Sequence, residues 1–548
     1  MKTTQQLHVR MLLRLIVSLV VVTAAIGALS DVAFAQTAIP EQWQPLDINV
    51  DGETKLPASL NDVAPSCRYG VSASEIGAPF LTNVGVGWVY TFGAVKPDWV
   101  PEGIHFAHMI RLKQDKDGGT YLPSYTVRPS LSNNGLGRLI DANPGALWIV
   151  GNEVDRVARQ DDLMPDMYAT AYHDVYHYIK SRDPSARVAV SGLVQVTPGR
   201  LQYLDRVLSA YRLKYGTGMP VDVWTFHAYI FAERKEVYNG KGGNPVWAWI
   251  ANGTDPELAI KEPHEDRPHA ERLALCARED YYCIKEHDDP ALFEKQVVDM
   301  RRWMKINGYQ NTPLILTEWS QLFWYIVGAN GDCNIKDEDG NCFTPQRVTR
   351  FMERTLDYLD NATSQELGYP ADRYRMVQQW AWYSMDPLSR DVNTEGNPSL
   401  LVNWEGTALT QMGQKYKQRI ARAAGNPNLM VEQVLGGAVA PGEDGKLGVI
   451  IRNNGVKPTT QPFVVEFFSD EARTQKIGEA VVPAGLEGCA MQSIVVETTW
   501  PSRPAGVHRF WVSVDRASAI AGDDPSDNTG QGIVIASNNQ LRLPLVTR

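Results

Sequence analysis

The sequence predicts an α/β fold, a (β/α)8 TIM barrel, followed by a small all-β sandwich. Across residues 66–424, short apolar runs bounded by turn residues alternate with helical patterns, as in a barrel of buried parallel strands. Beyond residue 430 only short β runs separated by turns occur, which is typical of a β-sandwich. Residues 425–430, which begin Gly-Asn-Pro-Asn, are the predicted linker, residues 431–538 the sandwich and residues 539–548 a C-terminal tail.

Eight strands of the barrel are predicted from apolar runs, and four helices from their periodicity. The clearest helical pattern ends at Asp183-Pro184, because proline cannot continue a helix. The predicted strands are 68–73, 86–92, 104–112, 147–153, 187–194, 221–229, 314–319 and 376–383, and the predicted helices are 165–182, 293–306, 346–359 and 406–424.

The first 35 residues have the pattern of a secretory signal peptide. Three basic residues precede an apolar stretch over 15–29, and Ala33-Phe-Ala35 forms a small-residue cleavage site. The alternative is a membrane anchor, but the apolar stretch is short for a bilayer span. We therefore expect a secreted or cell-surface protein that starts near Gln36 with a lead-in segment over 36–65. No stable membrane insertion is expected after signal removal.

Charge and cysteine content narrow the class of protein. The chain has 53 Lys and Arg against 63 Asp and Glu, a net charge of −10, which falls to −12 without residues 1–35. This acidity argues against nucleic acid as a partner. Six cysteines fit an oxidising compartment. Because of their close spacing, we expect the disulfides Cys276–Cys283 and Cys333–Cys342. The pairing of Cys67 and Cys489 is left open.

Two connections are too long for plain barrel loops, 230–290 and 320–344. Both follow predicted strands, so both are expected on the C-terminal side of the barrel, where binding loops lie. No Cys/His spacing resembles a zinc site, and no metal or cofactor is predicted.

Glu153 and Glu318 carry the functional prediction. Each ends an apolar run, and they lie 165 residues apart. Strands of a barrel end at one mouth, so the two carboxylates are expected to meet there. Two carboxylates facing one bond are the equipment for glycoside hydrolysis. The alternative is a pair of buried structural glutamates held in ion pairs.

Four motifs together resemble clan A of the glycoside hydrolases, a superfamily of retaining enzymes on β/α barrels. They are Gly151-Asn152-Glu153, His227-Ala-Tyr229, Thr317-Glu318-Trp319 and Trp380-Ala-Trp382. The resemblance covers about residues 66–424. It implies that Glu153 is the general acid/base and Glu318 the nucleophile. For this division of labour, Glu318 has to stay ionised, and its charge would raise the pKa of Glu153.

The same resemblance implies the substrate-binding residues. Asn152 would bind the 2-hydroxyl of the sugar, while the alternative is a loop cap. His227 and Tyr229 would lie beside the nucleophile, while the alternative is a hydrogen-bonded core pair. Trp382 would stack on the sugar, with Trp380 as its rival. Trp88 and Tyr90 could line the same mouth or pack inside the barrel.

Two departures leave the family within the clan, the sugar and the linkage open. Val154-Asp155 follows Asn152-Glu153, where many clan members have proline. Several families of the clan carry an arginine on strand two that supports the nucleophile. Strand two has none here, and Arg111 or Arg68 is the candidate substitute.

The C-terminal segment resembles a bacterial adhesion-related, immunoglobulin-like module of the CARDB type. The residues behind this resemblance are Ile451-Arg-Asn-Asn-Gly455 and Asp524-Pro-Ser-Asp527-Asn528. It implies a spacer, or attachment to a cell surface or to glycan. The aspartates at 515, 523, 524 and 527 form either a solvated loop or a calcium site.

These observations together predict a secreted, retaining, cofactor-free glycoside hydrolase that acts on a polysaccharide or oligosaccharide. The alternative is a non-catalytic surface protein that binds glycan or mediates adhesion on a barrel scaffold.

Overall fold

The computed structural model describes residues 65–234, 247–263, 267–276, 278–323, 325, 333, 335–388, 397–423 and 425–537. The predicted signal peptide, the C-terminal tail over 539–548 and the lead-in segment up to residue 64 lie outside the described residues. Among the described helices, none combines the length and the apolar character needed to cross a membrane.

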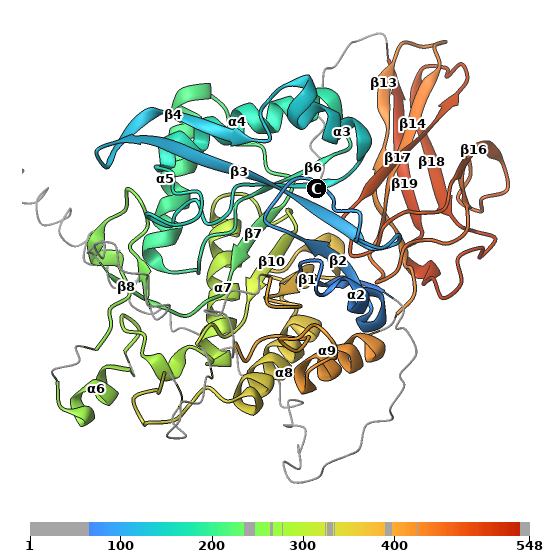
Figure 1. Ribbon diagram of the computed structural model, residues 1–548. Helices are drawn as coiled ribbons and strands as arrows, with labels where there is room; N and C mark the ends of the chain where they lie inside the picture. The colour runs from blue at the N-terminus through green and yellow to red at the C-terminus, as the bar shows by residue number, and fades with distance from the viewer. Residues whose placement is uncertain are drawn as a thin grey trace, which may run out of the picture. The chain divides into compact units, whose positions relative to one another are not determined.

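Eight parallel strands form a nearly closed ring (Figure 1). β11 pairs with β1, and a single bridge joins Ala189 to Val223, just before β7, so that the two ends of the sheet nearly meet. Every predicted barrel strand overlaps one of these eight. In ring order they are β1 (Ser66–Ser72), β2 (Val86–Tyr90), β3 (His105–Asp117), β5 (Leu147–Val150), β6 (Arg187–Val190), β7 (Trp224–His227), β10 (Leu314–Trp319) and β11 (Gln379–Trp382).

Helices lie outside the ring of strands (Figure 1). The predicted helix 165–182 matches the observed α4, and α5 is a long helix that was not predicted. The helices are α2 (Ala78–Val84), α3 (Arg138–Ala142), α4 (Pro165–Arg182), α5 (Pro198–Tyr215), α6 (His269–Cys276), α7 (Pro290–Ile306), α8 (Pro345–Asn361) and α9 (Gln411–Arg422).

The barrel strands alternate between two buried faces, as the period of two requires. On β11, Trp380 and Trp382 belong to the large cluster that also holds the helix residues, whereas Ala381 belongs to a second cluster. That second cluster fills the inside of the barrel, since nearly every strand contributes to it. It contains Trp88, Tyr90, Ala107, Met109, Leu147, Ile149, Ala189, Val223, Ile315 and Ala381.

Two further strand pairs were not predicted. β3 continues beyond the ring and pairs antiparallel with β4 (Thr120–Arg128). In the long connection after β7, β8 (Ala232–Arg234) pairs with β9 (Trp247–Trp249). The two predicted disulfides, Cys276–Cys283 and Cys333–Cys342, are present in the long connections, and Cys67 pairs with Cys489.

The residues after α9 form strands in two sheets around a shared apolar core, and are called here the C-terminal β-region (429–536). One sheet has the order β12-β14-β17 and the other β13-β19-β18-β15-β16. The strands are β12 (Leu429–Leu435), β13 (Gly437–Val439), β14 (Gly445–Asn453), β15 (Phe463–Phe468), β16 (Lys476–Val482), β17 (Ser493–Trp500), β18 (Gly506–Val514) and β19 (Thr529–Ala536).

A segment of the C-terminal β-region packs into the barrel. Cys489 and Met491 are buried among the residues that fill the barrel, and Cys489 is bonded to Cys67 at the start of β1. Glu487 of the same segment pairs with Arg187 at the start of β6. These contacts lie at the N-terminal ends of the strands, so the C-terminal β-region closes the end of the barrel opposite to the mouth.

The aspartates at the end of the C-terminal β-region are engaged with the protein. Asp515 accepts hydrogen bonds from the backbone amides of Ala519 and Ile520. Asp523 accepts one from the amide of Leu429 and one from the side chain of Asn528. Asp515 therefore fixes a local turn, and Asp523 ties its loop to the start of β12.

Candidate active site

Glu153 is presented by a turn with an unusual backbone. β5 ends at Val150, and both Gly151 (φ +96°) and Glu153 (φ +47°) adopt left-handed conformations. Asp161 holds the turn, because one of its carboxylate oxygens accepts a 2.8 Å hydrogen bond from the amide of Asn152. A left-handed conformation is uncommon for a residue other than glycine and often marks a functional site.

Glu318 and His227 lie near the C-terminal ends of adjacent strands. Glu318 is in β10 and His227 ends β7, and the two residues are paired in register. The ring of His227 passes close to Gly192, where an added Cβ would lie 2.6 Å from the imidazole. A side chain at position 192 would therefore displace the histidine.

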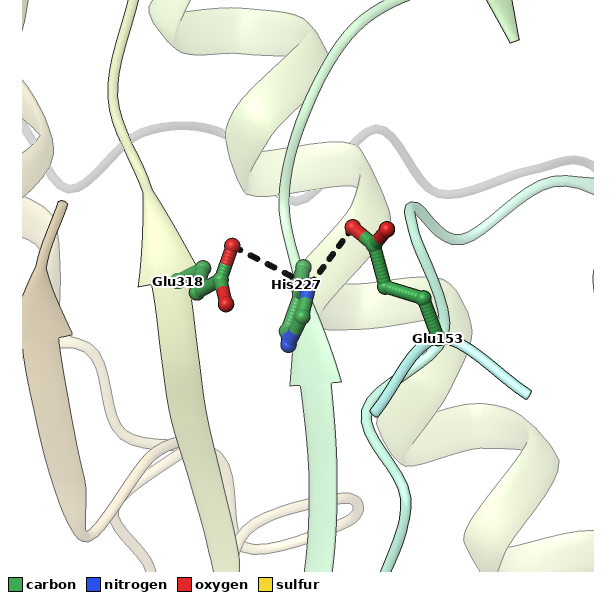
Figure 2. Close-up of side chains that lie close together, drawn as sticks. All are labelled: Glu153, His227 and Glu318. Atoms are coloured by element: carbon green, nitrogen blue, oxygen red, sulfur yellow. Dashed lines mark hydrogen bonds and ion pairs between the residues drawn. The ribbon is translucent and has the colours of Figure 1, made fainter. Parts of the chain in front are cut away.

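The three side chains converge, as Figure 2 shows. Nδ1 of His227 lies 3.2 Å from Oε1 of Glu153 and 3.6 Å from Oε2 of Glu318. One carboxylate oxygen of each glutamate and one ring nitrogen of the histidine all lie within 4.8 Å of one another. The structure therefore brings together the two glutamates that the sequence singled out, and all three side chains are buried.

Glu318 is held by tyrosines. The hydroxyl of Tyr229 donates a 2.9 Å hydrogen bond to Oε2 of Glu318. Tyr90, at the end of β2, lies near enough that the Glu318 charge adds to burial in raising the pKa of its hydroxyl. The other oxygen of Glu318, Oε1, is buried without a hydrogen-bond partner among the described residues. Tyr229 therefore contacts Glu318 directly. Of the two alternatives open for Tyr90, neither excludes the other, because Tyr90 packs inside the barrel and also lies near Glu318.

Glu153 is held by a cation. Nη1 of Arg156 donates a 2.6 Å hydrogen bond to Oε2 of Glu153, so the two form an ion pair three residues apart. This arginine was missed in the sequence. The signal that could have found it is the basic residue at the third position after Glu153, which a tight turn brings back toward the carboxylate.

The pKa directions of the two glutamates are opposite to the expected ones. Burial raises the pKa of Glu153, but Arg156 and His227 outweigh it and lower that pKa to about 2. Burial raises the pKa of Glu318; His227 opposes this shift and Glu153 reinforces it. Burial lowers the pKa of His227, but Glu318 and Glu153 outweigh it and raise that pKa. Without substrate, Glu153 is therefore the more readily ionised glutamate.

The side chain of Asn152 has no hydrogen-bond partner among the described residues. Its side chain is buried, and neither its Oδ1 nor its Nδ2 forms a hydrogen bond within the described part of the chain. A buried amide without hydrogen bonds is costly, and a ligand hydroxyl would satisfy it. The expected alternative, a loop cap by the Asn152 side chain, is not observed.

The tryptophans on β11 do not face the site, which corrects an expectation. Trp382 packs edge-on against Trp319 and donates a hydrogen bond to the carbonyl of Ser399, and Trp380 packs against Tyr69. Both are fully buried between the strands and the helices. The strand alternation points them outward and leaves the opposite face to Ala381 and the residue after Trp382.

That residue is Tyr383, which the sequence motifs did not indicate as a site residue. Its ring meets that of Tyr229 edge-on, with 6.5 Å between centroids, and it also contacts Phe92. Burial raises the pKa of its hydroxyl, and the charges of Glu318 and Glu153 add to this effect. Tyr383, the residue directly after β11, is therefore the aromatic residue that lies near the carboxylates at this end of the strand.

Trp88 also lies away from the mouth. It is buried in the barrel and lines a cavity of about 280 Å³ together with Cys67, His105 and Glu487. These residues mark the closed end of the barrel, one layer of side chains below Tyr90. Of the two open alternatives for Trp88, packing inside the barrel is the one observed.

Neither candidate arginine contacts Glu318. Arg68 forms a buried bidentate ion pair with Asp372, and Arg111 pairs with Asp161. Arg111 still serves the site indirectly, because its partner Asp161 holds the amide of Asn152. The part of a supporting arginine at Glu318 is taken by Tyr229 and His227.

A buried ionic network stabilises the turn that carries Glu153. Asp155 pairs with Arg200 of α5, and Arg200 also pairs with Glu233 of β8 at 2.8 Å. These residues come from the segments that follow β5, β6 and β7. The network therefore ties together three of the connections around the site and fixes the chain two residues after Glu153.

Glu153, His227 and Glu318 are also the residues that could hold a cation, since each offers one ligand atom. A nitrogen and two carboxylate oxygens suit several divalent metals. Arg156 already places a positive charge on Glu153, however, and this charge would repel a metal. The absence of a metal remains a prediction.

No model of a known protein family matches the chain, and no curated protein sequence matches it. Among solved structures, the chain is similar to a glucosidase from Croceicoccus marinus, with 10% identity, a TM-score of 0.39 and coverage of 81% of this chain and 95% of that one. A β-xylosidase from Caulobacter crescentus has 13% identity, a TM-score of 0.35 and coverage of 81% and 98%. The CARDB domain of a Pyrococcus furiosus protein has 17% identity, a TM-score of 0.18 and coverage of 20% and 90%.

Proposed function

We propose that the protein is a retaining glycoside hydrolase that cleaves O-glycosidic bonds of a polysaccharide or oligosaccharide. One observation carries the proposal: a carboxylate oxygen of Glu153, just beyond β5, and one of Glu318, near the C-terminal end of β10, lie within 4.8 Å of each other. Retaining glycosidases have carboxyl groups about 5–5.5 Å apart, whereas inverting enzymes need about 6.5–9.5 Å to admit a water. The short separation supports a mechanism through a covalent intermediate.

In the first step, a carboxylate oxygen of Glu318 attacks the anomeric carbon of the sugar. The bond from that carbon to the leaving oxygen breaks, and Glu153 donates its proton to the leaving oxygen. The product of this step is a glycosyl ester on Glu318 and an alcohol, which departs. Oε1 of Glu318, which has no hydrogen-bond partner among the described residues, is the candidate attacking atom.

In the second step, Glu153 acts as a base. It removes a proton from water, and the water oxygen attacks the anomeric carbon and displaces Glu318 as a carboxylate. The two displacements restore the original anomeric configuration. The hydrogen bond from Tyr229 stabilises the departing carboxylate, and the unpaired amide of Asn152 offers a partner to the sugar 2-hydroxyl.

We infer an extracytoplasmic location and a role of the C-terminal β-region in attachment. Three disulfides fit an oxidising compartment, and they agree with the signal peptide expected over 1–35. The two sheets of the C-terminal β-region support the proposal of an immunoglobulin-like sandwich. In this proposal it supports the barrel and attaches it to a cell surface or to glycan.

The test is hydrolysis by the purified protein, started at Gln36, of a panel of glycans and aryl glycosides. The anomer released first should have the configuration of the substrate, as followed by NMR. A 2-fluoro glycoside of the best substrate should label Glu318, which peptide mass spectrometry locates. Glycan binding without hydrolysis of any member would favour the adhesion alternative and overturn this proposal.

A further inference from the structure

Arg156 has a position at the site that the two-carboxylate mechanism does not explain. A general acid has to carry a proton when substrate is bound. Arg156 opposes this, because its guanidinium lies 2.6 Å from Oε2 of Glu153 and favours the ionised carboxylate. In the free protein, therefore, the ion pair holds Glu153 in the wrong protonation state for the first step.

The guanidinium is only partly engaged. Within the described part of the chain, its bond to Glu153 is the only hydrogen bond that the side chain makes, and its Nε is buried without a partner. A quarter of the side-chain surface is exposed. The remaining donors of the fork are thus available to a ligand that enters the mouth.

Arg156 also differs in charge from the other residues that contact the two glutamates. Among the described residues, it is the one lysine or arginine that contacts either Glu153 or Glu318. A neutral sugar hydroxyl would not compete with a carboxylate for this guanidinium, because an ion pair with hydrogen bonds is the stronger interaction. A carboxylate on the ligand would compete, since it matches the fork of an arginine with two parallel bonds.

We propose that Arg156 is a specificity residue for substrates with a carboxylate beside the scissile bond, that is, uronic acid glycosides. This inference rests on the proposed glycosidase function and names its substrate class. The substrate carboxylate draws the guanidinium away from Glu153, and binding of the correct sugar thereby removes the partner that keeps Glu153 ionised. Glu153 then takes up the proton that it needs as the acid.

The experiment uses matched pairs of aryl glycosides that differ only in the oxidation state of C6. Suitable pairs are p-nitrophenyl glucuronide with glucoside and galacturonide with galactoside, each as both anomers. The variants are Arg156→Gln, which removes the charge, and Arg156→Lys, which keeps the charge but loses the fork. Arg159→Gln is the matched control, because Arg159 is an exposed arginine of the same loop, and its side chain forms no hydrogen bond or ion pair with the residues that the structure describes.

The expected result is that the wild-type protein prefers the uronide of a pair. Arg156→Gln should lower kcat/KM on the uronide by about 10- to 100-fold relative to the neutral partner, the range for loss of a hydrogen-bonded charge. Arg156→Lys should recover only part of this loss, and Arg159→Gln should leave the ratio unchanged. Calorimetry with Glu318→Gln in buffers of different ionisation enthalpy should show proton uptake on binding of the free uronate and none with the neutral sugar.

Two outcomes would overturn the inference in distinguishable ways. In the first outcome, neutral glycosides are cleaved, but Arg156→Gln changes kcat/KM equally for both members of a pair. The proposed glycosidase function would then be supported, and the proposed role of Arg156 in uronate specificity would be wrong. If no glycoside of the panel is cleaved by the wild-type protein, the proposed function falls, and this inference with it.

Discussion

The hydroxyl of Tyr229, just beyond β7, donates a 2.9 Å hydrogen bond to Oε2 of Glu318 on the neighbouring strand β10. Glu318 is buried, and its pKa is raised by burial, with His227 opposing and Glu153 reinforcing the shift. In such surroundings the Tyr229 donor is one of few groups that favour the ionised carboxylate. The nucleophile is therefore predicted to depend on this tyrosine.

Tyr229→Phe should lower kcat by about 10- to 100-fold, because a hydrogen bond to a charged group is lost. It should also shift the pH profile. Loss of the donor raises the pKa of Glu318 further, and the nucleophile has to be ionised, so the acid limb should move to higher pH. Tyr172→Phe is the control, because the Tyr172 hydroxyl is buried and has no hydrogen-bond partner among the described residues, so the acid limb of this variant should stay in place. A pH profile of Tyr229→Phe whose acid limb stays at the wild-type pH would contradict this prediction.

Glu318→Ala should abolish nearly all turnover while the fold persists, since the glycosyl ester forms on this residue. A small anion such as azide can occupy the space left by the carboxylate and attack the anomeric carbon directly. The expected product is a glycosyl azide of inverted configuration, which NMR identifies. Wild-type activity in Glu318→Ala would show that Glu318 is not the nucleophile.

Glu153→Ala should lose more activity on natural glycosides than on activated aryl glycosides. A natural leaving oxygen needs a proton, whereas a nitrophenolate leaves without one. The measurement is kcat/KM on a series of leaving groups of decreasing pKa, and the slope should be steeper in the variant. Equal losses across the series would mean that Glu153 positions the substrate and does not donate a proton.

Much of the barrel follows from local patterns, which explains why it was predictable. β5, β6 and β10 each contain a short apolar run, and Glu153 and Glu318 stand where such runs stop. The contacts of Arg156 were not predictable in this way, because they depend on a turn with two left-handed residues. The predicted order of the pKa values of Glu153 and Glu318 was wrong for the same reason, because the low pKa of Glu153 depends in part on its contact with Arg156.

The error at β11 has a simpler cause. Trp380 and Trp382 share one face of the strand, and a sequence motif does not say which face is inside. Two bulky rings fit between the strands and the helices, while the inside position is filled by Ala381. A strand with large residues at alternate positions could equally have pointed them inward, so only the packed structure decides in favour of Tyr383.

The backbone of Glu153 yields a stability prediction. Its φ of +47° favours glycine, so the left-handed conformation costs the folded state about 1 kcal/mol with any side chain that has a Cβ. Glu153→Gly and Glu153→Ala remove the same carboxylate, so their difference isolates this strain. Glu153→Gly should be the more stable of the two by up to about 1 kcal/mol in urea unfolding, although both lose activity. A more stable alanine variant would argue against strain at this turn.

The C-terminal β-region should be needed for the stability of the barrel but not for its chemistry. The linker over 425–430, with no catalytic candidate beyond it, predicts that a chain ending at residue 424 folds alone, unless Cys489 pairs with Cys67. Cys489 and Met491, however, are buried among the barrel residues, and Cys489 is bonded to Cys67. Shortening the chain to residue 424 exposes the apolar residues at the closed end of the barrel and also removes the disulfide. We therefore expect a clearly lower Tm and poorer solubility.

Two single variants separate these effects in the full chain. Met491→Ala should cost about 2–5 kcal/mol of unfolding free energy, as for a large buried side chain, and Val495→Ala, on the exposed face of β17, should cost less than about 0.5 kcal/mol. In both variants kcat per folded molecule should match that of the wild type, because Met491 packs at the closed end of the barrel and the carboxylates lie at the mouth. A Met491→Ala protein of unchanged Tm would show that the C-terminal β-region does not stabilise the barrel. A normal Tm shift with a large loss of kcat would instead show that packing at the closed end of the barrel is transmitted to Glu153 and Glu318.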